Sequence, residues 1–238
     1  GKLAVKTQDE LRVAPHPVLS EYYKDETGRR GRVDGMFDSS AKHYDWIISV
    51  MSFGSGKWYR RRALERSGLR PGMKVLDVGS GTGVVACLAR NIIQGQGLVV
   101  ALDPSKGMLG EAKTRGVRNV VQGLGEKLPF ADDTFDRVTM GYALRHVADL
   151  NALFIEYRRV LKPGGEILLL EITRPESVLL GALLKFYMKG VMPSLTRLFR
   201  RSSEAQELMR YYWDTIEQCV PPATILETMT EVCLHQSR

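Results

Sequence analysis

The stretch Lys74-Val75-Leu76-Asp77-Val78-Gly79-Ser80-Gly81-Thr82-Gly83 decides the fold of this 238-residue chain. Its apolar first half is typical of a buried strand, and its three glycines permit a tight turn before the helical pattern that follows. The spacing Gly79-x-Gly81-x-Gly83 differs from the G-x-G-x-x-G loop of dinucleotide-binding proteins. A turn of this kind leaves the first N–H groups of the next helix available to a ligand.

Strand-like apolar runs alternate with helical patterns after this stretch. The alternation predicts an α/β fold with a mostly parallel, doubly wound sheet that helices cover on both faces. Lys162-Pro163-Gly164-Gly165 predicts the turn before the fifth strand. The predicted strands are 74–79, 98–103, 119–122, 135–141 and 166–172. The predicted helices are 84–93, 106–114, 151–161, 178–189, 203–218 and 222–232.

The length of the chain favours a single domain with one sizeable core. Residues 1–33 mix Pro, Gly and charges without a period, which predicts an extended or poorly ordered arm. We expect one domain over 34–238, with a helical cap at 34–70 and a helical lid inserted at 178–218.

Two acidic residues stand where the predicted strands end. Asp77 precedes the glycine turn and could meet a cationic amino-acid group of a ligand directly or through water. Asp103 ends the second strand, where a carboxylate can accept hydrogen bonds from both hydroxyls of a ribose. Asp103 could also be the N-cap of the helix near Ser105, with Pro104 in its first turn. S-adenosylmethionine (SAM) contains both a ribose and a cationic amino-acid group, so it is a ligand that could interact with both acidic residues.

Several short motifs together resemble a known family. They are Tyr44-Asp45, Met51-Ser52-Phe53-Gly54, Val75 to Gly83, Leu128-Pro129-Phe130 with Phe135-Asp136, Leu144-Arg145, and Tyr157 to Gly165. Over residues 36–193 the chain resembles the ubiquinone/menaquinone biosynthesis C-methyltransferases, a branch of the class I SAM-dependent methyltransferases. The glycine loop and the Lys-Pro-Gly-Gly turn occur in many class I enzymes. The Met-Ser-Phe-Gly and Leu-Arg motifs are narrower.

This resemblance implies SAM as the cofactor and a class I, Rossmann-like sheet whose last strand is antiparallel. Cys233-Leu234-His235 resembles the end of that strand. The resemblance further implies that adenine lies near Leu124 and Gly125 and that Gly141 and Tyr142 lie beside the sulfonium. The full set of expected cofactor residues is Asp77, Gly79, Ser80, Gly81, Thr82, Gly83, Asp103, Pro104, Met108, Leu124, Gly125, Gly141 and Tyr142.

Arg145 and His146 are the predicted catalytic residues. Arg145 matches an arginine that orients water or substrate in the family. Its guanidinium is always protonated, so it would stabilise a phenolate or order a water molecule rather than act as a base. His146 replaces the family's asparagine and could be a general base, or it could point into the following helix.

Other positions also depart from the family pattern and leave the acceptor open. Leu124 stands in place of an asparagine or aspartate, Gly141 in place of a serine, and Val84 in place of an aspartate. The predicted function is C-methylation of a prenylated quinol or a similar hydrophobic phenol. The alternative is a class I methyltransferase for another small molecule or lipid, such as a phospholipid amine. A SAM-binding protein without catalysis is the third reading, against which the retained acidic and glycine motifs argue.

We expect the acceptor pocket to include Tyr44, Met51, Phe53 and Tyr187, although such side chains are as often ordinary core. The apolar stretch 179–199 with its basic interruptions predicts a lid over a tunnel for a prenyl tail that also touches a membrane surface. The expected partners are therefore a hydrophobic small-molecule substrate and a membrane surface, with a homodimer as a further hypothesis.

The charge and cysteine patterns argue against a nucleic-acid-binding protein, a disulfide-bonded protein and a metalloprotein. The net charge is +7, but the basic groups at 29–32, 60–62 and 197–201 form no stripe with aromatic residues, so we expect solvated or membrane-facing surfaces and no nucleic-acid partner. The three cysteines are widely spaced, so neither disulfides nor a metal site are expected. No membrane span or signal peptide is apparent, which favours a cytoplasmic location, or an organelle matrix after removal of a transit segment.

Overall fold

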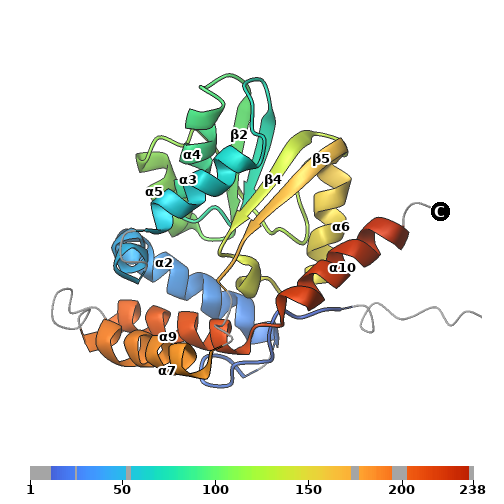
Figure 1. Ribbon diagram of the computed structural model, residues 1–238. Coiled ribbons are helices and arrows are strands. Elements are labelled where there is room, and N and C mark those ends of the chain that lie inside the picture. The colour runs from blue at the N-terminus through green and yellow to red at the C-terminus, as the bar shows by residue number, and fades with distance from the viewer. Residues whose placement is uncertain (1–11, 25, 52–54, 173–176, 195–202, 236–238) are drawn as a thin grey trace, which may run out of the picture.

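The computed structural model describes residues 12–24, 26–51, 55–172, 177–194 and 203–235. A five-stranded sheet forms its centre, in the order β3-β2-β1-β4-β5 with every pairing parallel (Figure 1). The strands are β1 (Lys74–Val78), β2 (Leu98–Asp103), β3 (Asn119–Gln122), β4 (Phe135–Gly141) and β5 (Leu161–Leu170). The predicted α/β class and the five strands are confirmed. The strand order reverses direction between β1 and β4, which opens a crevice at the carboxyl edge of the sheet.

The fifth strand begins earlier than the predicted range 166–172. Its pairing register with β4 shifts between Phe135 and Arg137, and Gly164 has a φ of 77°. The Lys-Pro-Gly-Gly segment therefore forms a bulge inside β5, because pairing with β4 exists on both sides of it.

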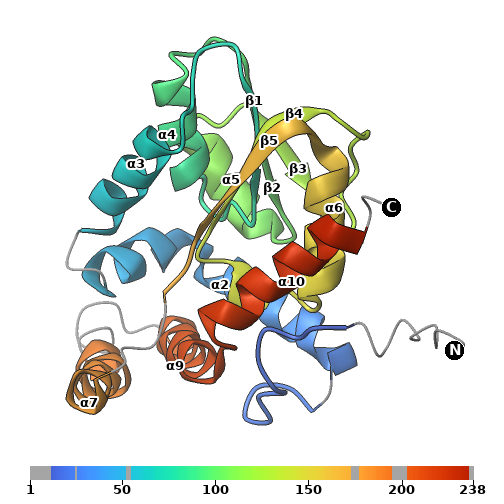
Figure 2. The same ribbon diagram turned by 45° about the vertical axis from the view of Figure 1, so that its right-hand side comes forward.

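Helices cover both faces of the sheet. On one face lie α3 (Gly56–Arg66), α4 (Val84–Ile92) and α5 (Lys106–Thr114); on the other lie α6 (Leu150–Val160) and α10 (Pro222–His235) (Figure 2). Alternate residues of β1 enter the two cores, since successive strand side chains point to opposite faces. Val75 packs in the core under α3, α4 and α5, whereas Leu76 and Val78 pack in the core under α6 and α10.

A third layer of helices covers the carboxyl edge of the sheet. It contains α2 (Glu26–Met51), α7 (Val178–Phe186), the π-helical turn η2 (Tyr187–Val191) and α9 (Ser203–Gln218) (Figure 1). Buried Ile47, Leu208 and Tyr212 belong to the core between α2 and α9. Asp38 of α2 accepts hydrogen bonds from the Gly107 N–H (2.8 Å) and the Ser105 hydroxyl, which tie this layer to the start of α5. The predicted cap and lid thus pack on each other.

The segment before α2 packs on the domain. Residues 12–24 have little regular structure, as expected for the arm, but Val13 N–H donates to Asp149 Oδ1 (3.0 Å) and Leu19 and Tyr23 are buried. The helix α2 starts at Glu26, eight residues before the predicted start of the cap. The reason is that Arg29 and Val33 are buried on the same face of α2 as Met36, so the helical period continues further back.

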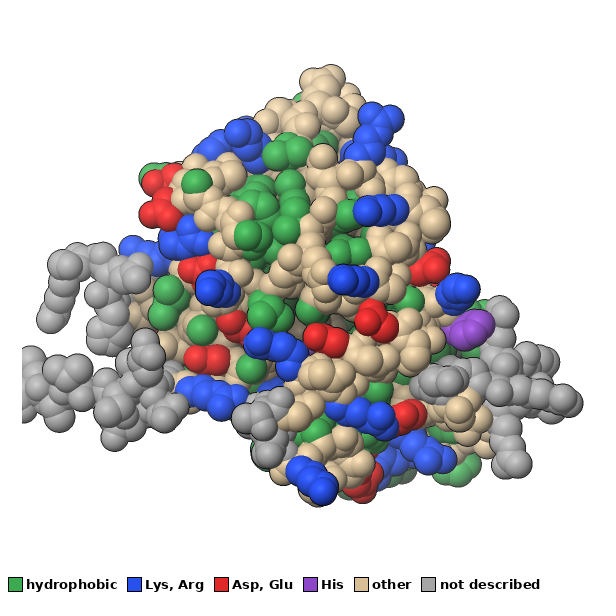
Figure 3. Space-filling view, turned by 180° about the vertical axis from the view of Figure 1, so that it is seen from behind, with side chains coloured by type: hydrophobic (Ala, Val, Ile, Leu, Met, Phe, Trp, Pro, Cys, Tyr) green, Lys and Arg blue, Asp and Glu red, His purple; other side chains and the backbone are tan. Residues whose placement is uncertain are grey.

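The end of the chain departs from the expected antiparallel strand. Cys233-Leu234-His235 continues α10 instead of pairing with the sheet, and the five strands of the described residues are all parallel. Within the described residues, no helix is both long enough and apolar enough to span a membrane. On the face seen in Figure 3, Lys and Arg side chains are interspersed with acidic and uncharged ones.

Candidate active site

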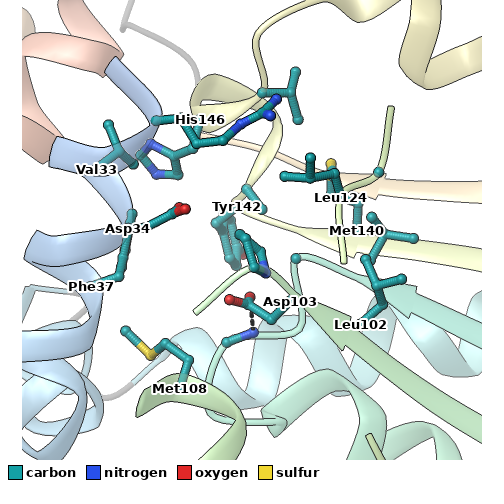
Figure 4. A pocket seen from close by; sticks show the side chains of 18 of the residues that line it. Val33, Asp34, Phe37, Leu102, Asp103, Met108, Leu124, Met140, Tyr142 and His146 are labelled. Atoms are coloured by element: carbon teal, nitrogen blue, oxygen red, sulfur yellow. Dashed lines mark hydrogen bonds between the residues drawn. The ribbon is translucent and has the colours of Figure 1, made fainter. Parts of the chain in front are cut away.

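A cavity of about 360 Å³ lies where the carboxyl edge of the sheet meets α2. Figure 4 shows side chains from α2, β2, β4, α5 and η1 (Leu144–His146) converging on it. Eleven of the predicted site residues line it: Tyr44, Gly79, Gly81, Asp103, Pro104, Met108, Leu124, Gly125, Gly141, Tyr142 and His146. The sheet topology brings these residues together, because the carboxyl ends of neighbouring parallel strands share one edge.

Asp103 is the main acidic group of this cavity. Its Oδ2 accepts from Gly81 N–H (2.8 Å) and its Oδ1 from Ser105 N–H (2.9 Å), so each oxygen keeps one lone pair for a ligand. Burial raises the pKa of this carboxyl to about 6, although both N–H groups oppose the rise. Ser105, not Asp103, is the N-cap of α5, since its hydroxyl accepts from Met108 N–H (3.0 Å). The N-cap role therefore belongs to Ser105, and hydrogen bonding of Asp103 to a ribose stays a prediction.

The three glycines of the loop serve different purposes. A Cβ on Gly79 would lie 2.5 Å from the Ala143 Cβ, and one on Gly83 would lie 2.7 Å from Val117 Cγ2. Both positions thus require glycine for packing as well as for their positive φ. Gly81 also has a positive φ, but it lines the cavity and has open space around the Cβ position, so its backbone is what faces a ligand.

Asp77 lies behind the cavity wall rather than in it. Its side chain is fully buried, and its Oδ1 accepts from the Thr139 hydroxyl (2.7 Å). Burial raises its pKa to about 7, although the Thr139 hydrogen bond opposes the rise. The second carboxylate oxygen, Oδ2, is buried without a partner among the described residues, and the predicted contact with the cofactor, direct or through water, stays a prediction. The carboxylate faces the α4 side of the sheet with Val75 and supports the loop from below.

Ser80, Thr82 and Gly83 likewise shape the loop without lining the cavity. Ser80 and Thr82 are buried, and the Thr82 hydroxyl donates to Asp45 Oδ1 (2.6 Å). Asp45 is also paired with Arg115, whose Nε donates to the Thr82 carbonyl (2.8 Å). This network holds the loop against α2, and the predicted cofactor contacts of these three residues stay predictions.

Arg145 is fully buried and lies outside the residues that line the cavity. Its Nε donates to Glu171 Oε1 (2.8 Å) and its Nη1 to the Thr215 hydroxyl (2.5 Å) and the Tyr212 carbonyl (3.2 Å). The guanidinium joins η1 to the segment that follows β5, through Glu171, and to α9, through Tyr212 and Thr215. These contacts hold η1 against α9 and the segment after β5, and the predicted catalytic role of Arg145 stays a prediction.

His146 does face the cavity. Its ring stacks on Tyr211 (5.4 Å between centroids), its Nδ1 lies 3.2 Å from the Tyr211 hydroxyl, and its buried Nε2 has no partner among the described residues. Burial and the positive charge of the neighbouring Arg145 lower its pKa well below the ordinary value. His146 is therefore neutral at neutral pH, with an imidazole edge available to a ligand.

The four residues predicted to line the acceptor pocket do not come together at one place. Tyr44 lines the cavity, and its hydroxyl hydrogen bonds with that of Tyr212. Tyr187 packs in the core between α2 and α9 and lines neither this cavity nor the second one described below. Met51 is the last residue of α2, and Phe53 lies outside the described residues.

Residues of α2 complete the site, and the sequence reasoning missed them. Val33, Asp34 and Phe37 point into the cavity from the side opposite the sheet (Figure 4). Burial raises the pKa of Asp34. The spacing of Arg29, Val33 and Phe37 at i, i+4 and i+8 is the signal that a helical face was present, but it lay across the predicted arm boundary.

A second cavity of about 300 Å³ adjoins the first at Tyr142 and Tyr212, which line both. It lies between α3, α7, η2 and α9. Its wall is mainly apolar and aromatic: Ile48, Trp58, Tyr59, Tyr142, Ile172, Leu184, Met188, Tyr212, Trp213 and Ile216. Tyr142 has a φ of 62°, unusual for a residue with a side chain, and its ring stands between the two cavities.

Comparison with known proteins gives consistent matches. A family model described as the ubiE/COQ5 methyltransferase family matches residues 24–236. Ubiquinone/menaquinone biosynthesis C-methyltransferase UbiE from a Shewanella species is 36% identical over 211 residues, 86% of this chain and 83% of that protein; UbiE from Shewanella baltica matches equally. A SAM-dependent methyltransferase structure from Thermotoga maritima has a TM-score of 0.58 at 22% identity, covering 83% of this chain and 79% of that one. That likeness shows the shared fold.

The residues of the first cavity suit SAM. The Asp103 carboxylate has two free lone pairs for the ribose hydroxyls, and the Gly81 backbone borders the same space. Apolar Leu124 and Met108 flank it, which suits an adenine ring held by packing. These residues would hold the nucleoside, while Tyr142 lines both this cavity and the second one.

Proposed function

The chain belongs to the ubiE/COQ5 methyltransferase family and is a SAM-dependent methyltransferase, and we propose that it methylates a ring carbon of a hydrophobic phenol, first of all a prenylated quinol. SAM supplies an electrophilic methyl group when bound. The observation that carries the proposal is the apolar second cavity, which meets the cofactor cavity at Tyr142. An acceptor ring beside Tyr142 would have its reacting carbon next to the methyl donor, in a site whose wall is mainly apolar.

The shape and chemistry of the second cavity favour a ring with an apolar tail. Leu184, Met188 and Ile216 offer dispersion contacts and no hydrogen bonds to a polar chain. A small polar acceptor would leave its own donors unpaired there, which costs about 1–3 kcal/mol for each group. A prenyl chain has no such groups. The cavity therefore favours an amphipathic acceptor over a small amine.

Ring methylation at carbon requires the acceptor hydroxyl to lose its proton, so that negative charge reaches the ortho carbon. We assign the hydrogen-bond acceptor for this hydroxyl to His146 Nε2, which is neutral and has no partner among the described residues. Arg145 keeps η1 in place through Glu171 and Thr215, and its positive charge keeps His146 unprotonated. In this scheme Arg145 positions His146 and does not touch the acceptor.

We further propose that α7 contacts a membrane surface from which a lipid-tailed acceptor enters. Most of its apolar side chains are exposed rather than packed: Val178, Leu179, Leu180, Leu183 and Phe186, all 60% exposed or more. An apolar face of this kind is typical of interfacial helices. It adjoins the second cavity, because Leu184 of the same helix lines that cavity.

The test of the proposed function is methyl transfer by the purified protein from labelled SAM. We expect transfer to demethylated quinols with prenyl tails, with weaker transfer to the same rings without a tail. A panel of phenols and amines is the comparison. Transfer to amines and to no quinol would replace the proposal with another acceptor class, and absence of SAM binding in calorimetry would contradict the cofactor assignment.

A further inference from the structure

The second cavity contains one charge in an otherwise apolar wall. Among the described residues that line it, Arg60 alone carries a formal charge. Arg60 comes from α3, in the basic run Arg60-Arg61-Arg62 that sequence reasoning assigned to a surface. It is only 9% exposed, whereas the neighbouring Arg61 side chain is 66% exposed. The three arginines are therefore not equivalent.

The Arg60 guanidinium lacks the partners that a buried cation ordinarily has. Arg61 and Arg62 both pair with Glu65, but Arg60 has neither an ion pair nor a side-chain hydrogen bond in the described part of the chain. Its one specific contact among the described residues is with the Tyr142 ring, whose centroid lies 4.6 Å from the guanidinium carbon. A cation–π contact offsets only part of the cost of burying a charge. Five N–H donors thus remain beside the cavity.

Arg60 lies beside Tyr142, at the wall between the two cavities. Tyr142, on which it stacks, lines both cavities. Burial raises the pKa values of Tyr44, Tyr142 and Tyr212, and the positive charge of Arg60 opposes this rise at all three hydroxyls. The positive charge of Arg60 therefore already favours the ionised form of the protein's own phenolic hydroxyls near this wall.

We propose that Arg60 binds the ionised ring oxygen of the acceptor and thereby favours its phenolate form in the second cavity. The proposal rests on the proposed function and deepens it, because it names the group that recognises the acceptor oxygen. The guanidinium is always protonated and can donate two parallel hydrogen bonds. When the phenol ionises, its O–H bond breaks, the electron pair stays on oxygen, and the proton passes to solvent by way of His146 Nε2, the hydrogen-bond acceptor assigned above. The negative charge that remains is shared with the ortho carbon.

The low-polarity wall strengthens this effect. Among the described side chains that line the second cavity, Arg60 is the only formal cation that a bound phenolate could contact. Charge attraction is stronger there than in water, since the surrounding side chains are apolar and screen little. A neutral phenol gains less from the same guanidinium. Because Arg60 stabilises the phenolate more than the neutral phenol, it should lower the pKa of a bound phenol.

The test uses 4-nitrophenol, whose neutral and ionised forms absorb at different wavelengths, with the full chain and without SAM. The bound probe in the wild-type protein is expected to ionise at a pH at least about one unit lower than in water, a tenfold change in the ionisation constant. Arg60→Met should lose this shift, and Arg60→Lys should keep part of it, because the charge stays and the planar fork is lost. Arg61→Met, on the same helix, should retain the full shift.

Circular dichroism and SAM calorimetry show whether each variant is folded. An unchanged shift in folded Arg60→Met, an equal loss in Arg61→Met, or no binding of the probe to the wild type overturns the inference. The measurement involves no methyl transfer, so it is independent of the proposed function. A wild-type protein that shifts the probe but methylates no phenol contradicts the proposed function and leaves Arg60 as an anion-binding group.

Discussion

The backbone N–H of Gly81 donates a hydrogen bond to Asp103 Oδ2 at 2.8 Å, which joins the glycine turn after β1 to the acid that ends β2. The loop and the carboxylate are thus one unit: the carboxylate orients the turn, and the turn leaves one lone pair on each carboxylate oxygen for a ligand. From this relationship we expect cofactor binding to depend on pH and on the conformation of the turn.

SAM affinity should fall as the pH falls through about 6. Burial raises the Asp103 pKa to about 6, and only the ionised carboxylate can accept hydrogen bonds from both ribose hydroxyls. Calorimetry between pH 8 and 5 should show the loss in the wild type. Asp103→Asn should bind SAM about 10–100-fold more weakly, because a charge-assisted hydrogen bond is lost. The affinity of this variant should not change with pH between 8 and 5. Asp132→Asn, at an exposed carboxylate, is the control; a pH-independent wild type would refute the assignment.

The same raised pKa affects the stability of the unliganded protein. A carboxyl with a folded pKa of about 6 and an ordinary value of 3.8 binds more protons in the folded state between these two pH values. Asp103 therefore makes folding less favourable as the pH rises through this window.

Gly83→Ala should destabilise the fold by about 2–4 kcal/mol. The substitution combines a left-handed backbone, which costs about 1 kcal/mol, with overpacking, which costs about 1–3 kcal/mol. The new Cβ would lie 2.7 Å from Val117 Cγ2 and 3.0 Å from the Ala112 Cβ. Chemical denaturation measures the change. Gly110→Ala in α5, with open space and an ordinary φ, should be neutral or slightly stabilising; equal losses at both sites would contradict the argument.

Glu171→Gln should destabilise the protein by about 3–5 kcal/mol, the cost of leaving a buried partner charge uncompensated. The Arg145–Glu171 pair is buried, with side chains 0% and 10% exposed. Glu166→Gln in β5 removes the ion-pair partner of Arg137 in β4, but the Glu166 side chain is 65% exposed, so a loss of about 0–1 kcal/mol is expected. Urea denaturation of both variants makes the comparison. Similar losses would mean that Arg145 does not depend on its partner.

His146→Phe should reduce the rate of methyl transfer by about 10²-fold while leaving SAM affinity nearly unchanged. Phenylalanine keeps the ring packing on Phe37 and Tyr211 but removes the Nε2 acceptor. Because the His146 pKa is well below its ordinary value, this residue should add no rate change to the wild type between pH 6 and 8. Single-turnover rates and calorimetry separate the two effects. A rate loss that only follows weaker SAM binding would remove the proposed role.

The double substitution Leu179→Ser and Leu183→Ser should weaken binding to vesicles that contain phosphatidylglycerol, measured by co-sedimentation. The two side chains are 71% and 60% exposed on α7, so their replacement removes apolar contact area and little packing. Leu226→Ser on α10, at 62% exposure, is the matched control. If the double variant instead lowers the molecular mass in analytical ultracentrifugation, α7 is a homodimer surface.

Local sequence rules predicted most of the sheet and its helices. The ranges 98–103, 119–122, 135–141, 106–114 and 203–218 agree with the observed elements, because periods of 2.0 and 3.6 residues are set by local geometry. The start of β5 and the start of α2 were wrong. A bulge at Gly164 depends on pairing with β4, and the first turns of α2 depend on packing against α9, so neither is a local property.

What the sequence by itself determined is the cofactor edge: Gly79, Gly81 and Asp103 follow neighbouring strands, and parallel strands must bring their carboxyl ends together. Only the tertiary structure decided which side chains face that edge. It placed Asp77 and Arg145 behind the wall, brought Asp34 in from α2, and buried Arg60 while Arg61 and Arg62 stayed at the surface. The physical reason is that burial of a charged side chain depends on the packing of distant helices, which no local pattern records.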